Sequence, residues 1–516
     1  MNSKLLTVII ILCGFFFWAS SLSFFPTPWP DDSAFFLTGI DWLKWPFHYR
    51  MHAQAAFVPS YDVVNFNSMP GLPLLMGIGN FLGIHSSHGI RVYGVLIFVF
   101  WALLLMKWME KKNFKPQWIW LITLAAFFSP VIRWGAMVVR PEIWIGFFWL
   151  LILMEFDGFW GRLNLWRLST FLALGAYVHF EAYFLILPTG IALLSRSLKE
   201  SLKMISGVFW RTLVLLSPWI VYLFSNFHLF QSQMLTQFSR LQIHNSYVED
   251  AYGVFHSLFL SLGNPVPYPK FFNLGKVLTW AGIVLAIGLG IYRSVKDPDK
   301  NKLVLASLLA FGLTFHLWIT KPETWFISLI HLSFWPLLIL VISSFRNPPP
   351  KWVGNLGCFF LGVLVFLEVS VAMMQWKNSR QVYNWEKYRN WVSCIENTIG
   401  DRQKIWQPHW PDILVELASH KPDKDYTRSV DFQGIRPLLE KYSREVEVVI
   451  HSYAFAPEQP EAQRDYQGPL KKEDAYYLTE YPWMPYKEYS ALVLGRPDQI
   501  QICHQGPFWA ALSILK

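Results

Sequence analysis

Two adjacent carboxylates, Asp31 and Asp32, stand in the segment PWPDDSAFFLTG, directly after an apolar run. A carboxylate can act as a general base that removes the proton from an attacking hydroxyl group. The same residues suit the start of a helix, because Asp31 follows Pro30 and a carboxylate in a first turn is stabilised by the helix dipole. The sequence alone leaves both interpretations open, a catalytic base and a helix cap.

Other ionisable residues stand where apolar segments begin or end. The segment IRWGAMVVRPEIW contains an Arg-Pro-Glu triplet, YVHFEAYF contains a His-Phe-Glu triplet, and TKPETWF contains a lysine. Ionisable groups at the rim of membrane spans are unfavourable unless they pair or face a wet cavity, so they are functional candidates, although any one pair can also simply end a helix. The cationic candidates are His48, Arg50, Arg133, Arg140, His179 and Lys321, and the supporting carboxylates are Glu142 and Glu181.

The elements that must position these residues are membrane helices. Of the 516 residues, 53% are hydrophobic and 15% are charged, whereas soluble domains have about 25% charged residues. Several apolar runs reach or approach the length of about 20 residues that spans a bilayer. The clearest runs are 5–25, 92–106, 208–224, 277–292, 303–319 and 326–343. The fold class expected is a polytopic α-helical membrane protein with about eleven transmembrane helices.

The distribution of basic residues predicts the topology. Lys and Arg collect in alternate short loops, which are normally cytoplasmic. This pattern places the amino terminus in the cytoplasm and a long first outward loop at residues 26–91, provided that residues 165–195 form a hairpin of two helices. All the candidate site residues then share the outer face of the cell inner (plasma) membrane. Because the net charge of +9 is explained by topology, no nucleic-acid partner is needed.

The amino-terminal run has a second interpretation. It can be a cleaved signal peptide, since small residues at 19–23 offer a cleavage site. A retained span is favoured, because the apolar stretch is long and Phe24 and Phe25 continue it.

The chain divides into a transmembrane domain at residues 1–374 and a soluble, extracytoplasmic α/β domain at residues 375–516. In the second domain EVEVVIHSYAF and YSALVLG are typical of strands, and WPDILVELASH and GIRPLLEKYSREV are typical of helices. Two of the four cysteines, Cys394 and Cys503, lie in this domain. Because cysteines in an oxidising compartment can pair, we predict a disulfide between them.

Four motifs resemble the GT-C superfamily of membrane glycosyltransferases that use polyprenyl-phosphate-linked sugars. They are DDSAFF, NFNSMPGLPLLMGIGNFLGI, VVRPEIWIGFFWLLIL and GAYVHFEAYFLILP. The branch most similar to this chain contains protein O-mannosyltransferases and aminoarabinose transferases of lipid A. The chain departs from the superfamily pattern at Phe35 and Phe36, where a tyrosine is common, and at the His-Phe-Glu triplet. It has no Walker loop, GxGxxG, HExxH or CxxC motif, so nucleotide-driven transport and zinc chemistry have no support.

The resemblance implies a polyprenyl-phosphate-linked sugar donor and a glycan, lipid or protein acceptor at the membrane surface. It implies that Asp31 or Asp32 is the base of an inverting transfer and that the cationic candidates bind the donor phosphate. Residues 69–84 are short for a span and contain two prolines, which predicts an amphipathic helix at the outer interface or, alternatively, a re-entrant or tilted span. The resemblance implies that this helix lies beside the donor groove. No cofactor is expected. A divalent cation is the alternative, because paired aspartates are hard oxygen ligands, but no second well-placed carboxylate is identifiable. The competing functions are a catalytically inactive GT-C-like scaffold subunit and a membrane transporter.

Overall fold

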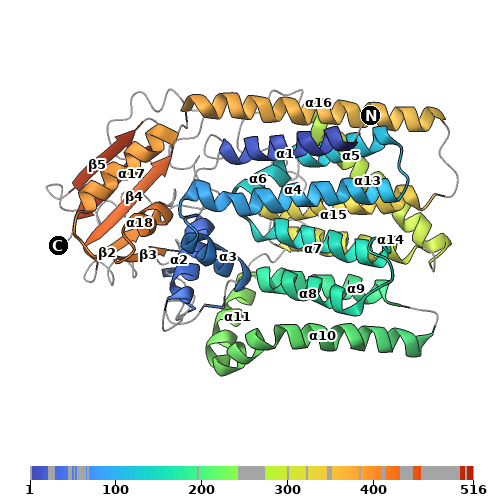
Figure 1. Ribbon diagram of the computed structural model, residues 1–516, viewed down its shortest axis with the longest axis horizontal. Coiled ribbons are helices and arrows are strands. Elements are labelled where there is room, and N and C mark those ends of the chain that lie inside the picture. The colour runs from blue at the N-terminus through green and yellow to red at the C-terminus, as the bar shows by residue number, and fades with distance from the viewer. Residues whose placement is uncertain are drawn as a thin grey trace.

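The structure is a computed structural model of the chain, a bundle of helices with a sheet at one end (Figure 1). It describes residues 3–20, 30–44, 49–50, 53–54, 65–66, 69–194, 197–241, 273–298, 301–320, 324–345, 351–382, 385–407, 413–429, 446–454, 500–505 and 508–514. The helices of the bundle are α1 (Ser3–Ala19), α2 (Pro30–Leu43), α3 (Gly71–Phe81), α4 (Ser87–Lys111), α5 (Pro116–Phe128), α6 (Pro130–Met137), α7 (Pro141–Phe156), α8 (Leu165–Val178), the 3-10 helix η2 (Phe180–Leu185), α9 (Ile186–Ala192), α10 (Leu198–Ser225), α11 (Phe227–Leu241), α13 (Asn273–Lys296), α14 (Lys302–Thr320), α15 (Thr324–Ser343) and α16 (Lys351–Val382).

Four helical segments are long and apolar enough to cross a membrane within the part of the chain that the structure describes. They are Ser87–Lys111, Leu198–Ser225, Leu278–Lys296 and Trp352–Met374. Helices α5 and α6 pass the same test as a pair with a bend of 54°, which gives five spans if the pair counts as one. Shorter apolar helices, among them α1, α3 and α8, accompany them. The chain therefore has the helices of a membrane protein, and the number of eleven spans stays a prediction.

Local backbone chemistry sets the two turns around α6. Pro130 begins α6 and has no backbone N–H with which to continue α5. At the other end of α6, Val139 adopts a left-handed conformation with φ 52°, and the Arg140 N–H donates to the Gly135 carbonyl at 3.0 Å. Glycine usually occupies the left-handed position of such a Schellman end. This turn places Arg140 at the N-cap position of α7, and Pro141 occupies the first helical position.

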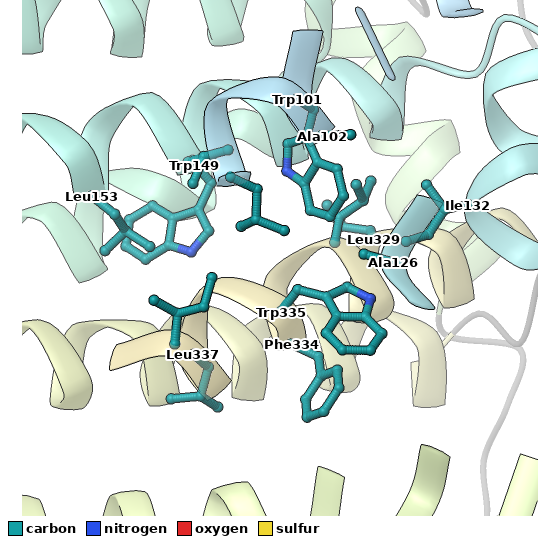
Figure 2. Packing of buried hydrophobic residues seen from close by; sticks show 14 of the residues in the cluster. Trp101, Ala102, Ala126, Ile132, Trp149, Leu153, Leu329, Phe334, Trp335 and Leu337 are labelled. Atoms are coloured by element: carbon teal, nitrogen blue, oxygen red, sulfur yellow. The ribbon is translucent and has the colours of Figure 1, made fainter. Parts of the chain in front are cut away.

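The core of the bundle is built from large aromatic side chains of α4, α7 and α15. Trp101, Trp149 and Trp335 are fully buried, and Figure 2 shows them packed among leucines such as Leu153 and Leu337. Close packing, rather than the exclusion of water, is what holds helices together in lipid. These tryptophans therefore fix the positions of the three helices relative to one another.

Glycines let α2 and α3 cross in backbone contact. A Cβ atom added to Gly39 would lie 2.0 Å from the Pro73 carbonyl oxygen, and one added to Gly77 would lie 2.4 Å from the Gly39 carbonyl oxygen. The start of α3 is equally close to the end of α8, where a Cβ on Gly71 would lie 2.7 Å from the Tyr177 carbonyl oxygen. Helix α2 is thereby held against α3, and α3 against the end of α8.

Ion pairs show which helix ends lie together. Helices α4 and α7 run parallel, because Lys112 after α4 pairs with Asp157 after α7 at 2.8 Å. Helix α8 runs the other way, since Arg167 in its first turn pairs with Glu155 in the last turn of α7. We call the end that holds these four residues the basic end. The opposite end, where α4 and α7 begin and α8 ends, is called the site end (Figure 1).

A sheet lies beyond the site end (Figure 1), and the described residues supply six strands to it. Its strands are β1 (Ala53–Gln54), β2 (Lys404–Gln407), β3 (Asp425–Ser429), β4 (Val448–Ala454), β5 (Ile500–Gln505) and β6 (Phe508–Ile514), in the order β1-β3-β2-β4-β6-β5. The first four in that order pair in parallel, and β6 pairs antiparallel with both β4 and β5. Helices α17 (Trp385–Ile399) and α18 (Leu414–His420) accompany the sheet. Its edge strand β1 comes from the segment between α2 and α3.

Several sequence predictions fall within the described residues. Strand β4 lies inside EVEVVIHSYAF and α18 lies inside WPDILVELASH. A disulfide joins Cys394 of α17 to Cys503 of β5, the pair chosen from the sequence. Residues 165–194 form two helical segments that meet at His179, which has an extended backbone. The segment YSALVLG and nearly all of GIRPLLEKYSREV lie outside the described residues.

Candidate functional site

The acidic pair stands in the first turn of α2, at the site end. Asp31 and Asp32 follow Pro30, the first residue of the helix, as expected for carboxylates at the positive end of a helix dipole. The side chain of Asp32 is only 1% exposed. It interacts electrostatically with the guanidinium of Arg91, which is fully buried in the second turn of α4. Asp32 is thus an enclosed carboxylate facing a buried cation.

The same guanidinium faces groups of the carboxyl-terminal region. Arg91 interacts electrostatically with Glu416 of α18 and with Tyr388 of α17. Glu416 accepts hydrogen bonds from the backbone N–H and from the hydroxyl of Ser87, both at 2.8 Å. All four side chains are buried. Two helices of the carboxyl-terminal region, which we call the tail (residues 385–516), therefore interact with the start of α4.

Burial shifts the proton affinities of the two tail residues. Desolvation raises the pKa of Glu416, and the hydrogen bonds from Ser87 oppose that rise. Desolvation also raises the pKa of Tyr388 well above its usual value, with the neighbouring Glu416 carboxylate adding to the effect. The Tyr388 hydroxyl is accordingly protonated at neutral pH and is available as a donor.

Arg140 and Glu142 form a buried bidentate pair at the start of α7. The Arg140 Nε donates to Oε2 of Glu142 at 3.1 Å, and Nη2 donates to Oε1 at 2.9 Å. Both side chains are more than 90% buried. An arginine fork matches a carboxylate or a phosphate in this two-bond geometry. The Arg-Pro-Glu triplet thus presents a cation that is already oriented by its own carboxylate.

His179 and Glu181 repeat this spacing at the end of α8. The His179 Nδ1 lies 3.4 Å from Oε2 of Glu181, and the backbone N–H of Glu181 donates to the same ring nitrogen at 3.3 Å. The imidazole stacks on Phe180 at a centroid distance of 4.4 Å. As a proton can be held on either ring nitrogen, His179 can act as donor or acceptor at this position.

Packing brings these two triplets to the acidic helix. Val139 precedes Arg140, and Val178 precedes His179. Both valines belong to one buried hydrophobic cluster with Phe36 of α2. Helix α2, the residue before the Arg140 turn and the end of α8 therefore share one buried cluster, and Asp32 links the start of α2 to Arg91 of α4. That the candidate residues share one face of the membrane stays a prediction.

Aromatic residues form a wall beside this region. Tyr49, Phe66 and Trp219 are buried together, with Trp219 edge-on to both other rings at 5.7 and 6.0 Å. Gln233 of α11 joins this group, because its side-chain oxygen accepts a hydrogen bond from the Phe66 N–H at 2.9 Å. These rings pack on one another. Tyr49 and Phe66 belong to the segment after α2, so their packing on Trp219 holds that segment against α10.

Arg133 lies in a different neighbourhood from Arg140. Its guanidinium stands over the Phe17 ring of α1 at 5.5 Å from the centroid. It also interacts electrostatically with Glu368 of α16. The sequence predicted Arg133 but not this carboxylate. The signal was present, because Glu368 is the one charged residue of the apolar stretch 352–374.

The remaining cationic candidates are Arg50, His48 and Lys321. Arg50 pairs with Asp41 of α2 through its Nε at 2.6 Å and is partly exposed. His48 and Lys321 lie outside the described residues. Residues that the sequence interpretation missed are Arg91, Ser87, Tyr388 and Glu416. An arginine close to the start of an apolar helix was the available signal for Arg91.

Within the described ranges, no group of three or more His, Cys, Asp or Glu side chains is arranged to hold a metal ion. No protein-family model matches this chain, and no curated protein matches it either.

Proposed function

We propose that this protein is an inverting glycosyltransferase that uses a polyprenyl-phosphate-linked sugar. The donor binds at the site end of the bundle, on the outer face of the cell inner membrane, with the amino terminus in the cytoplasm and the tail domain outside. The acceptor is a glycan, a lipid or a protein. The resemblance of four motifs to the GT-C superfamily supports this assignment, and no cofactor is required by the chemistry.

A single arrangement carries the proposal. Helix α2 shares one buried hydrophobic cluster with Ile90 of α4, with Val139 before α7 and with Val178 of α8. The two valines precede an arginine and a histidine that each pair with a glutamate two residues later. Carboxylate bases and oriented cations at one end of a membrane bundle suit a reaction between a hydroxyl group and a lipid phosphate ester.

The transfer proceeds by one displacement. A carboxylate takes the proton of the acceptor hydroxyl while the acceptor oxygen bonds to the anomeric carbon. The bond from that carbon to the phosphate oxygen breaks, and polyprenyl phosphate leaves with the electron pair. Asp31 is assigned as the base, because Asp32 is enclosed beside Arg91 and is suited to orienting the helix start. Arg140 and His179 are assigned to the phosphate, where negative charge grows.

The experiment starts from the purified full-length protein in lipid nanodiscs. A panel of polyprenyl-phosphate sugars is screened for a rise in melting temperature, because a ligand that binds only the folded state stabilises it. The stabilising donor is then used in a transfer assay with wild type, Asp31→Asn and Asp32→Asn. Loss of a general base is expected to slow transfer by about 10²- to 10⁴-fold in Asp31→Asn.

A matched control is available in the tail. Asp401→Asn makes the same chemical change at an exposed position, and its rate is expected to equal that of wild type. Wild-type rates in both Asp31→Asn and Asp32→Asn would contradict the proposal and would favour an inactive scaffold. Stabilisation by a solute that is then carried across the bilayer, without product, would favour a transporter.

A further inference from the structure

The tail region meets the bundle at the first turn of α4 through one short helix. Glu416 of α18 accepts two hydrogen bonds from Ser87. Three residues later, the Ser419 hydroxyl donates to the carbonyl of His85, just before α4. The partners are 329 and 334 residues apart in the chain. This contact is therefore a tertiary one, made only when both regions are folded.

The contact between α18 and α4 includes charged side chains that are buried. Glu416, Arg91 and Asp32 are each at least 95% buried and are electrostatically linked through Arg91. A buried charge is strongly unfavourable when it has no counter-charge. The cation between the two carboxylates compensates both of them. Any change in the charge of Glu416 is consequently felt by Arg91 and then by Asp32.

A second link joins the same part of the tail to the segment after α2. Strand β1 pairs in parallel with β3, with Ala53 beside Arg428 and Gln54 beside Ser429. Strand β3 is tied to α18, because the Tyr426 hydroxyl donates to the Leu417 carbonyl at 2.8 Å. The helix α18 and the strand β3 thus form one unit, which we call the α18–β3 unit (residues 414–429). It contacts the start of α4 through Glu416 and Ser419, and the segment after α2 through β1.

We infer that Glu416 is a positioning residue: through Ser87 and Arg91, the α18–β3 unit sets the place of the Asp31–Asp32 turn at the start of α2. This inference rests on the proposed function for its kinetic consequence. Its structural consequence, an ordered α2 start that depends on Glu416, does not rest on it. Misplacement of a reacting group by about 1 Å can slow a reaction by about 10²-fold.

The kinetic test uses Glu416→Gln in the full chain. Glutamine keeps the shape and one acceptor oxygen for Ser87 but removes the charge that faces Arg91. The value of kcat is expected to fall by about 10- to 100-fold, with the KM for the donor unchanged, because the residue does not touch the donor. Glu416→Asp, which restores the charge, is expected to recover part of kcat. Asp423→Asn, which removes a carboxylate charge at an exposed position of the same unit, is the matched control with wild-type kinetics.

The structural test reports on α2 without any reaction. Cys13 and Cys358, the two free cysteines, are replaced by serine, and Asp31→Cys is introduced as the labelling site. The rate of alkylation by a membrane-impermeant maleimide is then compared with and without Glu416→Gln. A loosened α2 start is expected to react faster when Glu416→Gln is present, and Asp423→Asn at an exposed position is expected to leave the rate unchanged.

The outcomes separate the two proposals. Wild-type kcat in Glu416→Gln, in a protein that transfers sugar, overturns the inference. If wild type transfers no sugar from any donor, the proposed function fails and labelling alone decides the inference: a faster rate supports it, and an unchanged rate overturns it. If Glu416→Gln does not fold, Glu416→Asp and its labelling rate decide in the same way.

Discussion

The two ends of α4 and α7 carry charge in opposite ways. At the basic end the pairing cations keep contact with water: Lys107 is 50% exposed beside Glu110, Lys112 is partly exposed beside Asp157, and Arg167, the partner of the buried Glu155, is 33% exposed. At the site end Arg91 is fully buried. The difference shows that the same helices use charge for two purposes. Partly hydrated pairs mark the rim of the bundle, whereas enclosed charges require partners from several elements and fix those elements in place.

The largest expected effect is the removal of the buried cation. Arg91→Met leaves two buried carboxylates without their shared counter-charge and is expected to destabilise the fold by about 3–5 kcal/mol. Lys107→Met, at the other end of the same helix, breaks an exposed pair and is expected to change stability by about 0–1 kcal/mol. Unfolding of both variants in nanodiscs, followed by tryptophan fluorescence, checks the difference. Equal losses would mean that burial of charge is not what distinguishes the two ends.

The next effect concerns the close crossing of α2 and α3. Gly39→Ala would place a methyl group 2.0 Å from the Pro73 carbonyl oxygen, so the helices must move apart, at a loss of about 1–3 kcal/mol. Gly288→Ala, in α13, has nothing within 4 Å and is expected to be neutral or slightly stabilising. The melting temperatures of the two variants give the comparison. A neutral Gly39→Ala would contradict the close contact and weaken the view that the site end is the tightly fixed one.

The pH dependence of stability tests the buried carboxylate Glu416, which lies against the site end. Burial raises the pKa of Glu416 in the folded state, so the folded protein binds more protons than the unfolded chain above the ordinary glutamate pKa of about 4.3. Stability from this group is therefore present at low pH and is lost as pH rises through the raised pKa. Glu416→Gln is expected to flatten this part of the curve of melting temperature against pH. An unchanged curve would exclude Glu416 as its source.

The smallest effect is expected at the turn before Arg140. Val139→Gly relieves a left-handed strain of about 1–2 kcal/mol and loses a buried side chain worth about 1.5–3 kcal/mol, so the two changes nearly cancel. Val138, equally buried, has an ordinary φ of −100°, and Val138→Gly is expected to lose the full amount. Denaturant titrations of both variants measure the difference. A Val139→Gly variant as unstable as Val138→Gly would show that the turn carries no strain.

The sequence predicted local and periodic features well. Apolar runs indicated the helices, the alternation in EVEVVIHSYAF indicated β4, and the breaks at Pro130 and Pro141 follow from the missing N–H group. These features depend on residues close to one another in the chain. That Arg140, His179 and the acidic pair share one membrane face stays a prediction, because it depends on the number and orientation of the spans.

What the sequence did not predict depends on distant partners. Nothing near Glu416 indicates that it lies against Ser87 and Arg91, because the contact spans 329 residues. The pairing of Arg133 with Glu368 is likewise set by how α6 and α16 pack. The two-residue strand β1 is too short for any periodic signal, and only the presence of β3 beside it makes it a strand.

The pairing of β1 with β3 has a consequence for how the chain is made. The segment after α2 emerges from the ribosome early, yet its edge strand must wait for residues 425–429 before it has a partner. Contacts of such long sequence separation form late, because the loop they close must be ordered first. The segment that follows the acidic helix is therefore ordered as a strand only after residues 425–429 are made. A chain that stops before these residues is expected to form its helices but to leave β1 unpaired, so this part of the fold is completed only late in synthesis.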